Sequence, residues 1–177
     1  MILLLLLAMA TPKGWMLAGA SPGDYEAGVD RKVTHGGKAS GFLRAKEMPK
    51  GFGTLMQMFK PDAYRGKRVR LSAWVKAQQV SNWAGVWMRV DGDDKTPLAF
   101  DNMQNRPIKG TSGWTKYEIV LDVADKATAI AFGILLDGAG EVWIDDVKFE
   151  VVDRSVPTTG FSGPGLPAAP ENLGFED

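Results

Sequence analysis

Apolar and polar residues alternate with a period of two through most of the chain between Lys13 and Asp153. In residues 67–78, every second side chain from Val69 to Val75 is aliphatic, and the side chains between them are polar, basic or aromatic. The same alternation recurs in residues 84–91 and 115–123. Such a pattern places one face of a β-strand in a core and the other toward solvent. Further strands are predicted near residues 38–45, 53–59, 98–103, 130–136 and 142–151.

Residues suited to turns separate these strands, and no segment shows a helical period of useful length. Glycine with aspartate, serine or arginine falls at residues 65–66, 91–93, 111–113 and 137–138, where hairpins need it. About ten short strands at this spacing predict an all-β fold, an antiparallel β-sandwich of the jelly-roll kind.

The two ends of the chain differ from this middle part, which we take as a β-sandwich over residues 11–153. Residues 1–10 read MILLLLLAMA, which fits a short secretory signal, an edge strand or the start of a fragment. This run is far below the ~20 residues that cross a bilayer, and its reading as a signal predicts a secreted or periplasmic protein. Residues 154–171 are rich in proline and glycine and predict a linker, which a short strand at residues 172–177 follows.

Composition removes several classes of function. The 21 basic and 21 acidic residues give a net charge of zero, so no basic field is present to bind nucleic acid or an anionic membrane. The absence of cysteine excludes disulfides, thiol catalysis and cysteine-ligated metals. The single histidine, His35, excludes sites built on a histidine pair, and its turn-like surroundings favour a structural role.

The candidate catalytic motifs fail on physical grounds. Residues 19–23 match the G-x-S-x-G string, but Pro22 has no N–H to serve as an oxyanion donor, and no helix follows. Glu118 and Asp122 share one strand face at a spacing of ~13 Å, which is too wide for a glycosidase pair. We therefore expect that the chain is not an enzyme.

The tryptophans are the unusual feature of the sequence, with six in 177 residues. Trp74 and Trp87 lie opposite the aliphatic stripes of their strands, among polar neighbours. An exposed indole beside amide and charged groups suits a sugar, whose C–H face stacks on the ring. The alternative is burial under loops, as expected for Trp15, Trp114 and Trp143. The predicted ligand-binding residues are Trp74, Trp87, Arg89, Asn102, Gln104, Trp83 and Gln78.

Four segments together resemble carbohydrate-binding modules of the family 4/9 type, which are jelly rolls of the galactose-binding-like group. The segments are residues 37–40 (GKAS), 64–76 (YRGKRVRLSAWVK), 113–117 (GWTKY) and 140–149 (GEVWIDDVKF). The resemblance covers roughly residues 14–152. It implies a non-catalytic module that binds a polysaccharide or oligosaccharide and serves an attached catalytic or regulatory domain.

The first strand of that family, Asn-x-x-Phe-Glu, is found here only at the C-terminus, in residues 172–176. Either a second module begins there, or the tail completes its own sandwich or that of a neighbour by strand exchange, which would give a homo-oligomer. The resemblance also implies a structural Ca²⁺ held by Glu176, the Lys38 carbonyl and Asp146, since calcium takes oxygen ligands.

The sequence therefore predicts a non-catalytic carbohydrate-binding module with no membrane span and no nucleic-acid partner. Two alternatives remain open. One is a structural or protein-interaction sandwich that assembles through its C-terminal strand. The other is a jelly-roll glycan hydrolase or lyase, which needs two convergent carboxylates or a Tyr/His pair beside the tryptophans.

Overall fold

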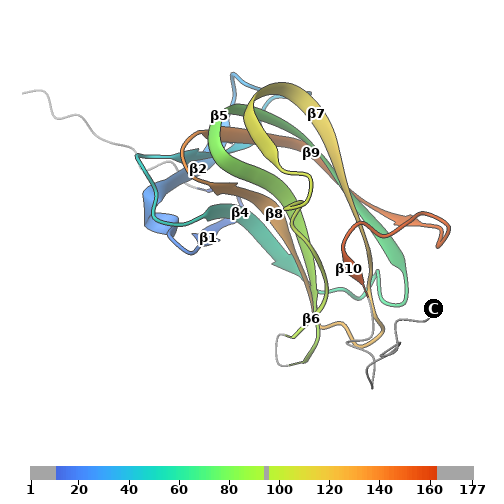
Figure 1. The fold of residues 1–177 in the computed structure, drawn as a ribbon. Helices are drawn as coiled ribbons and strands as arrows, with labels where there is room; N and C mark the ends of the chain where they lie inside the picture. The colour runs from blue at the N-terminus through green and yellow to red at the C-terminus, as the bar shows by residue number, and fades with distance from the viewer. Residues whose placement is uncertain (1–10, 94–95, 163–177) are drawn as a thin grey trace, which may run out of the picture.

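The computed structural model describes residues 11–93 and 96–162, which form a sandwich of ten antiparallel strands (Figure 1). Among these residues the helical content is one short 3-10 turn. The elements are β1 (Met16–Gly19), η1 (Pro22–Asp24), β2 (Tyr25–Asp30), β3 (Ser40–Ala45), β4 (Gly53–Phe59), β5 (Arg68–Asp91), β6 (Pro97–Asp101), β7 (Ile108–Asp122), β8 (Ala129–Asp137), β9 (Glu141–Val152) and β10 (Phe161–Ser162).

Strand β5 is 24 residues long and belongs to both layers of the sandwich. Its first part pairs with β9, from Arg68 opposite Val152 to Gln78 opposite Glu141. Its second part pairs with β8 from Trp83 onward. We call β2, β3, β9, the first part of β5 and the adjoining part of β7 sheet I. Sheet II consists of β1, β4, β8, the second part of β5 and β6. In Figure 1, β5 and β7 curve together from one layer to the other.

A bend in β5 carries the strand between the two sheets. Up to Ala77, the residues of β5 that face the core have odd numbers. From Val80 onward, the residues that face the core have even numbers. The pairing of β5 with β7 shifts register between Val75 and Ala84, and Gln79 has a φ of 53°. The sequence predicts two strands here, at residues 67–78 and 84–91. The structure has one, because the irregular pairing changes the direction of the strand without ending it.

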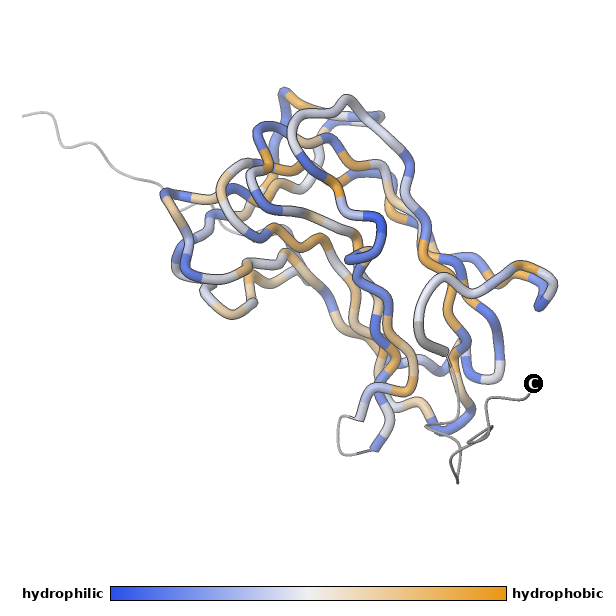
Figure 2. Tube along the Cα trace, viewed as in Figure 1, coloured by the Kyte–Doolittle hydropathy of each residue, from blue (hydrophilic) through white to orange (hydrophobic). Residues whose placement is uncertain are grey.

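The core between the sheets consists of the aliphatic stripes that the alternation predicts. Both layers contribute fully buried side chains to this core. In Figure 2 the apolar residues lie mainly along the strands. The predicted all-β, antiparallel fold is confirmed. The pattern missed β1 and β2, and the turn that it predicts at residues 111–113 lies inside β7. Representative core residues are Leu43, Leu55, Val69, Leu71, Val86, Met88, Ile119, Leu121, Ile134 and Leu136.

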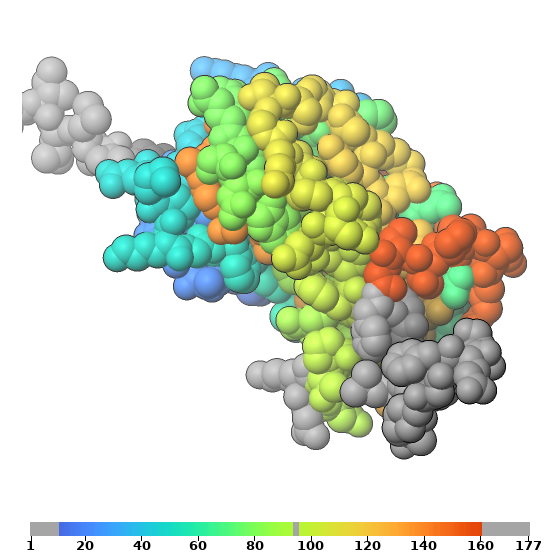
Figure 3. Space-filling view, in the orientation of Figure 1, coloured from blue at the N-terminus to red at the C-terminus, as the bar shows by residue number. Residues whose placement is uncertain are grey.

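Part of the segment that composition marks as a linker lies against the sandwich. Arg68 Nη1 donates to the carbonyls of Arg154 and Val156 at 2.8 and 2.7 Å. Thr159 N–H donates to the carbonyl of Val120, and β10 then pairs with β6. Figure 3 shows this stretch (orange-red) beside β7. The sandwich thus continues to residue 162. The leader at residues 1–10 and the predicted strand at 172–177 lie outside the described residues.

No helix in the described part of the chain has the length and apolar character needed to cross a membrane.

Candidate functional site

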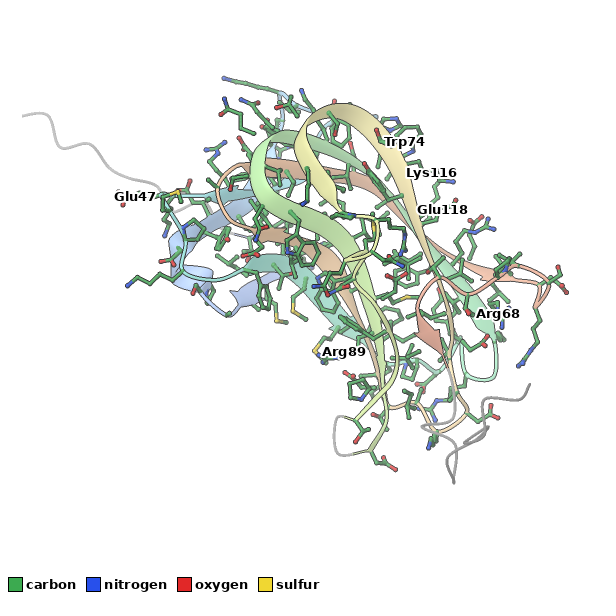
Figure 4. All side chains as sticks on the ribbon, viewed as in Figure 1. Glu47, Arg68, Trp74, Arg89, Lys116 and Glu118 are labelled. Atoms are coloured by element: carbon green, nitrogen blue, oxygen red, sulfur yellow. The ribbon has the colours of Figure 1, made fainter. Side chains whose placement is uncertain are left out.

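The two tryptophans expected to form one surface lie on opposite faces of the sandwich. Trp74 is on the outer face of sheet I, where its strand partners are Lys116 and Asp145. Trp87 is on the outer face of sheet II, opposite Gly133. In Figure 4 the labelled Trp74 lies in the first part of β5, beyond the labelled Arg68, and Arg89 lies near the other end of the strand. The structure therefore separates Trp74 from Trp87, because the bend in β5 reverses which side its outward residues face.

A groove of about 300 Å³ lies on the outer face of sheet II. We call it the sheet II groove. Strand register sets its floor, because Met56 lies opposite Gly133 and Gly133 lies opposite Trp87. The lining residues are Ala18, Gly19, Phe52, Thr54, Met56, Trp87, Arg89, Phe100, Asn102 and Leu135.

Trp87 is a fixed part of the groove floor. Its indole is only 7% exposed and packs with Met56, Ala131 and Leu135. Its Nε1–H donates to Thr54 Oγ1 at 2.8 Å, and the Thr54 hydroxyl donates in turn to the Ile134 carbonyl at 2.9 Å. The ring therefore has its polar atom satisfied inside the protein, and it is not the free stacking platform that the sequence predicts.

Arg89 is at the polar end of the groove and is held by a buried carboxylate. Its Nε and Nη2 donate to the two oxygens of Asp91 at 2.7 and 3.0 Å. Asp91 is 3% exposed, so this bidentate pair is fixed and close to neutral as a unit. Among the described residues Arg89 Nη1 has no hydrogen-bond partner.

Asn102 is the second polar side chain at this end of the groove. Its Oδ1 accepts the backbone N–H of Gln104 at 3.1 Å, which leaves the amide nitrogen as a donor. Gln104 itself is exposed and outside the groove lining, while Trp83 packs beside Trp87. Of the seven predicted residues, the structure gathers Trp87, Arg89 and Asn102 in the groove and places Trp83 next to it. Gln78 lies on the sheet I side, opposite Glu141.

The chemistry of the groove is mostly apolar. Methionine, leucine and phenylalanine side chains line it, and Phe100 and Phe52 at its sides are 37% and 36% exposed. The hydroxyl of Thr54, the indole N–H and two guanidinium nitrogens are already paired. A pyranose needs several vacant hydrogen-bonding groups around its hydroxyls, whereas the described side chains of this groove offer only the remaining donors of Arg89 and Asn102.

The outer face of sheet I is organised around His35, which the sequence treats as an isolated turn residue. The imidazole stacks on Trp74 with ring centroids 3.9 Å apart and planes 15° from parallel. Its Nδ1 lies 2.7 Å from Asp146 Oδ2, and its backbone N–H donates to Asp145 Oδ2 at 2.9 Å. Trp114 meets the same imidazole edge-on at 5.7 Å. No periodic pattern links residue 35 to these partners, because the segment between β2 and β3 is irregular.

The remainder of this face is aromatic and ion-paired. Trp143 is buried, its Nε1–H donates to Asp30 Oδ2 at 3.0 Å, and Lys76 Nζ lies 5.4 Å from its ring centre. Burial opposes the ionisation of Asp30, but hydrogen bonds from Lys32 N–H, Trp143 and Val33 N–H outweigh it and lower the pKa of Asp30 below its usual value.

Ion pairs extend across the same side of β5 and β7. The Arg68 guanidinium is bonded to both oxygens of Asp122 at 2.8 Å and holds the pKa of that carboxyl below its usual value. Lys116 Nζ lies 2.9 Å from Glu118 (Figure 4). These pairs leave the sheet I face polar and charge-balanced.

The described residues supply only part of the implied calcium site. Asp146 lies against the turn that contains Lys38, through its contact with His35, whereas Glu176 lies outside the described residues. Across residues 11–93 and 96–162, no three histidine, aspartate or glutamate side chains converge as a metal site would require. One carboxylate and one carbonyl are too few oxygen ligands for calcium, which takes six to eight. The calcium site stays a prediction that depends on Glu176.

No family model matches the sequence. The chain is, however, 49% identical over 168 residues to the uncharacterized HTH-type transcriptional regulator YbfP of Bacillus subtilis (strain 168). The match covers 93% of this chain and 57% of that relative, so the chain spans little more than half of the relative's length.

Solved structures with a similar fold include carbohydrate-binding modules. The CBM22-1 xylan-binding domain of Paenibacillus barcinonensis Xyn10C superimposes with a TM-score of 0.57 at 13% identity, covering 82% of this chain and 90% of that one. TmCBM61, solved with β-1,4-galactotriose, gives 0.53 at 13% identity over 82% and 92%. Tailspike protein 4 of bacteriophage CBA120 gives 0.62 at 14% identity, over 78% of this chain and 19% of that one.

These structures show the fold, and the predicted jelly roll is confirmed. They also support the resemblance to carbohydrate-binding modules at the level of the β-sandwich, while the specific family 4/9 assignment is not confirmed. Identities of 12–16% in this group do not transfer a ligand.

The expected function is corrected by the Bacillus subtilis relative. The sequence predicts a module whose role is to bind glycans through surface tryptophans. The protein with 49% identity over most of this chain is instead named as a transcriptional regulator. The geometry also argues against the predicted stacking platform, since Trp74 is covered by His35 and Trp87 is part of the groove floor.

Proposed function

We propose that this chain is the β-sandwich regulatory domain of a helix-turn-helix transcriptional regulator, a non-catalytic domain that does not itself contact DNA. The observation that carries the proposal is the 49% identity to a protein named as such a regulator, over 93% of this chain. The chain spans only 57% of that relative, which leaves ample sequence in the relative for a separate DNA-binding element.

The described residues lack the element that such regulators use to read DNA. A helix-turn-helix places a recognition helix in the major groove, and residues 11–93 and 96–162 contain no α-helix. The net charge of the chain is zero, and several arginines are committed to carboxylates. Binding to the phosphate backbone requires unpaired basic side chains in number. The committed arginines are Arg44 with Glu141, Arg68 with Asp122, Arg89 with Asp91 and Arg106 with Asp101.

The sheet II groove supports an effector-binding role for the domain. It is concave, mostly apolar and bounded by a few placed polar groups, which is the usual form of a small-molecule site. A ligand that binds one conformation of a regulator better than another shifts the population toward it, so a domain without DNA contacts is able to control DNA binding.

The Bacillus subtilis relative offers a direct test, because it joins this region to the remainder of a regulator. Strains carrying the full-length relative, or a version without the region that matches this chain, are compared by chromatin immunoprecipitation and by transcript sequencing. We expect the shortened protein to occupy the same DNA sites while the transcripts of the adjacent genes change at least severalfold.

Two outcomes would contradict the proposal. One is loss of all DNA occupancy in the shortened protein when it is shown to be folded and present at normal levels. The other is an unchanged transcript profile under every growth condition in which the full-length protein regulates its targets.

A further inference from the structure

We infer that the sheet II groove takes a neutral small molecule that has a flat apolar body and one hydrogen-bond acceptor, such as an aromatic amide or ketone. The inference deepens the proposed function, on which it rests for its biological role, by naming the class of effector. Its physical basis lies in three features of the groove: the size and lining of the floor, the fixed charge state of the polar end, and the donors that remain there.

The floor of the sheet II groove favours a ligand with a flat apolar body. The floor is a continuous apolar surface made of Met56, Trp87 and Leu135. Phe52 and Phe100 also line the groove. A volume of about 300 Å³ is at the lower end of the range of small-molecule sites, so it fits a ligand of one or two rings. Methionine and aromatic side chains favour flat, polarisable partners through dispersion and sulfur–aromatic contacts.

The polar end selects a neutral ligand over an anionic one. Among the described residues, Arg89 is the only cationic side chain in the groove lining, and its Nε and Nη2 already donate to both oxygens of Asp91. A ligand carboxylate would place a second negative charge beside the buried Asp91, without a second cation to balance it. A neutral carbonyl avoids that repulsion and still accepts a hydrogen bond.

The hydrogen-bond donors that remain in the groove favour a ligand with one acceptor over a ligand with many hydroxyls. Arg89 Nη1 and the Asn102 amide nitrogen are the donors left among the lining side chains, once the pairs with Asp91 and Gln104 are made. The other polar lining atoms, in Thr54 and Trp87, are bonded to each other and to the Ile134 carbonyl. A polyhydroxylated ligand would bury hydroxyls without partners against methionine and phenylalanine, which is costly.

The test uses the chain labelled with ¹⁵N at its six tryptophan indoles. Trp87→Phe and Trp74→Phe assign the two signals that report on sheet II and sheet I. The labelled chain is titrated separately with 2-naphthamide, 2-naphthoate and xylotriose. We expect 2-naphthamide to shift the Trp87 signal and leave the Trp74 signal unchanged. Binding of 2-naphthoate should be at least tenfold weaker, and xylotriose should produce no shift.

Asn102→Ala is the variant that tests the hydrogen bond to the ligand's acceptor, because Asn102 is partly exposed and its side-chain oxygen is bonded to the nearby Gln104 N–H. It should weaken 2-naphthamide binding about fivefold, the effect of one hydrogen bond. Lys109→Ala, at an exposed position outside the groove, is the matched control and should bind as the wild type does.

Three results would overturn the inference: 2-naphthoate binding as tightly as the amide, a Trp87 shift with xylotriose, or no Trp87 shift with 2-naphthamide up to its solubility limit. Because the titration involves no DNA, it separates this inference from the proposed function. Binding here with no regulatory effect in the relative would leave the groove assigned and remove its regulatory role.

Discussion

The two outer faces of this sandwich are built from one continuous strand, and they differ in chemistry. On sheet I, β5 presents Trp74 and Lys76 to a surface of stacked rings and ion pairs. On sheet II, the same strand presents Trp87 and Arg89 to an apolar groove. Tryptophans that look equivalent in the sequence thus have different roles, since one is covered by a histidine and the other is part of a groove floor.

The direction in which an outward side chain points depends on where its strand bends. Alternation in β5 continues on both sides of Gln79, but the positions that face the main core change from odd to even numbers. A surface inferred from alternation alone joins residues that a bend separates by the full thickness of the sandwich.

The largest expected effect concerns the close packing of strands under the sheet II groove. A Cβ at Gly133 would lie 2.3 Å from the Leu55 carbonyl oxygen, which belongs to the backbone and has no room to move. Gly133→Ala should lower the free energy of unfolding by about 3 kcal/mol, measured by urea denaturation. Gly113→Ala, where nothing lies within 4 Å, is the control and should change it by less than about 0.5 kcal/mol. Equal effects of the two would show that β4 and β8 are not so closely packed.

Exchanging each tryptophan for phenylalanine compares the two faces directly. Trp87→Phe removes the hydrogen bond to Thr54 and part of a buried ring, so it should cost about 2 kcal/mol. Trp74→Phe keeps a ring at a partly exposed position and should cost about 0.5 kcal/mol or less. A larger loss of stability for Trp74→Phe in the same denaturation experiment would reverse the contrast between the faces.

Tyr25 links the two layers, because its hydroxyl on β2 donates to the Gly51 carbonyl just before β4, at 2.9 Å. Burial, together with the nearby Asp137 carboxylate, raises its pKa from 10.0 to about 12. The folded state therefore favours the neutral phenol, and this contribution to stability is complete below pH 10. It should be lost as the pH rises from 10 toward 12, because the unfolded chain then ionises first.

Tyr25→Phe is the check on that account. It should cost about 1 kcal/mol at neutral pH and weaken the fall of stability in alkali. Absorbance at 295 nm should show one of the three tyrosines ionising later than the others. Ionisation of all three near pH 10 would contradict the burial of the Tyr25 hydroxyl.

The smallest expected effect on stability is that of removing His35, which covers Trp74. His35→Ala should change the free energy of unfolding by less than about 0.5 kcal/mol, because the histidine is exposed. It should nevertheless increase acrylamide quenching of tryptophan fluorescence. The increase should vanish in a Trp74→Phe background. An increase that persists there would mean that His35 shields a different indole.

The strands were predictable where alternation is regular, as in both parts of β5 and in the second half of β7. Strand β1 was missed because it has only four residues, and β2 because Gly28 interrupts its apolar pattern. Strand β10 was missed because it lies in a stretch whose composition is that of a linker. The groove was partly predictable, since Trp87, Arg89 and Asn102 were selected for facing outward beside polar groups.

The remaining site residues could not be found in the sequence. Met56, Thr54 and Leu135 meet Trp87 only through the pairing of β4 with β8 and of β8 with β5, which is long-range register. The contact of His35 with Trp74 and Asp146 depends on an irregular segment, which carries no periodic signal. The proposed regulatory role rests on the name of the relative and not on any motif in this chain.

The central claim is that this sandwich belongs to a regulator without touching DNA, and fluorescence anisotropy tests it most directly. Labelled DNA fragments bound by the full-length Bacillus subtilis relative are titrated with that relative and with this chain alone, at one fixed salt concentration. The account predicts that this chain binds at least a hundredfold more weakly than the full-length relative, with no preference for sequence. Affinity equal to that of the full-length relative, on the same fragments and not on unrelated ones, would contradict it.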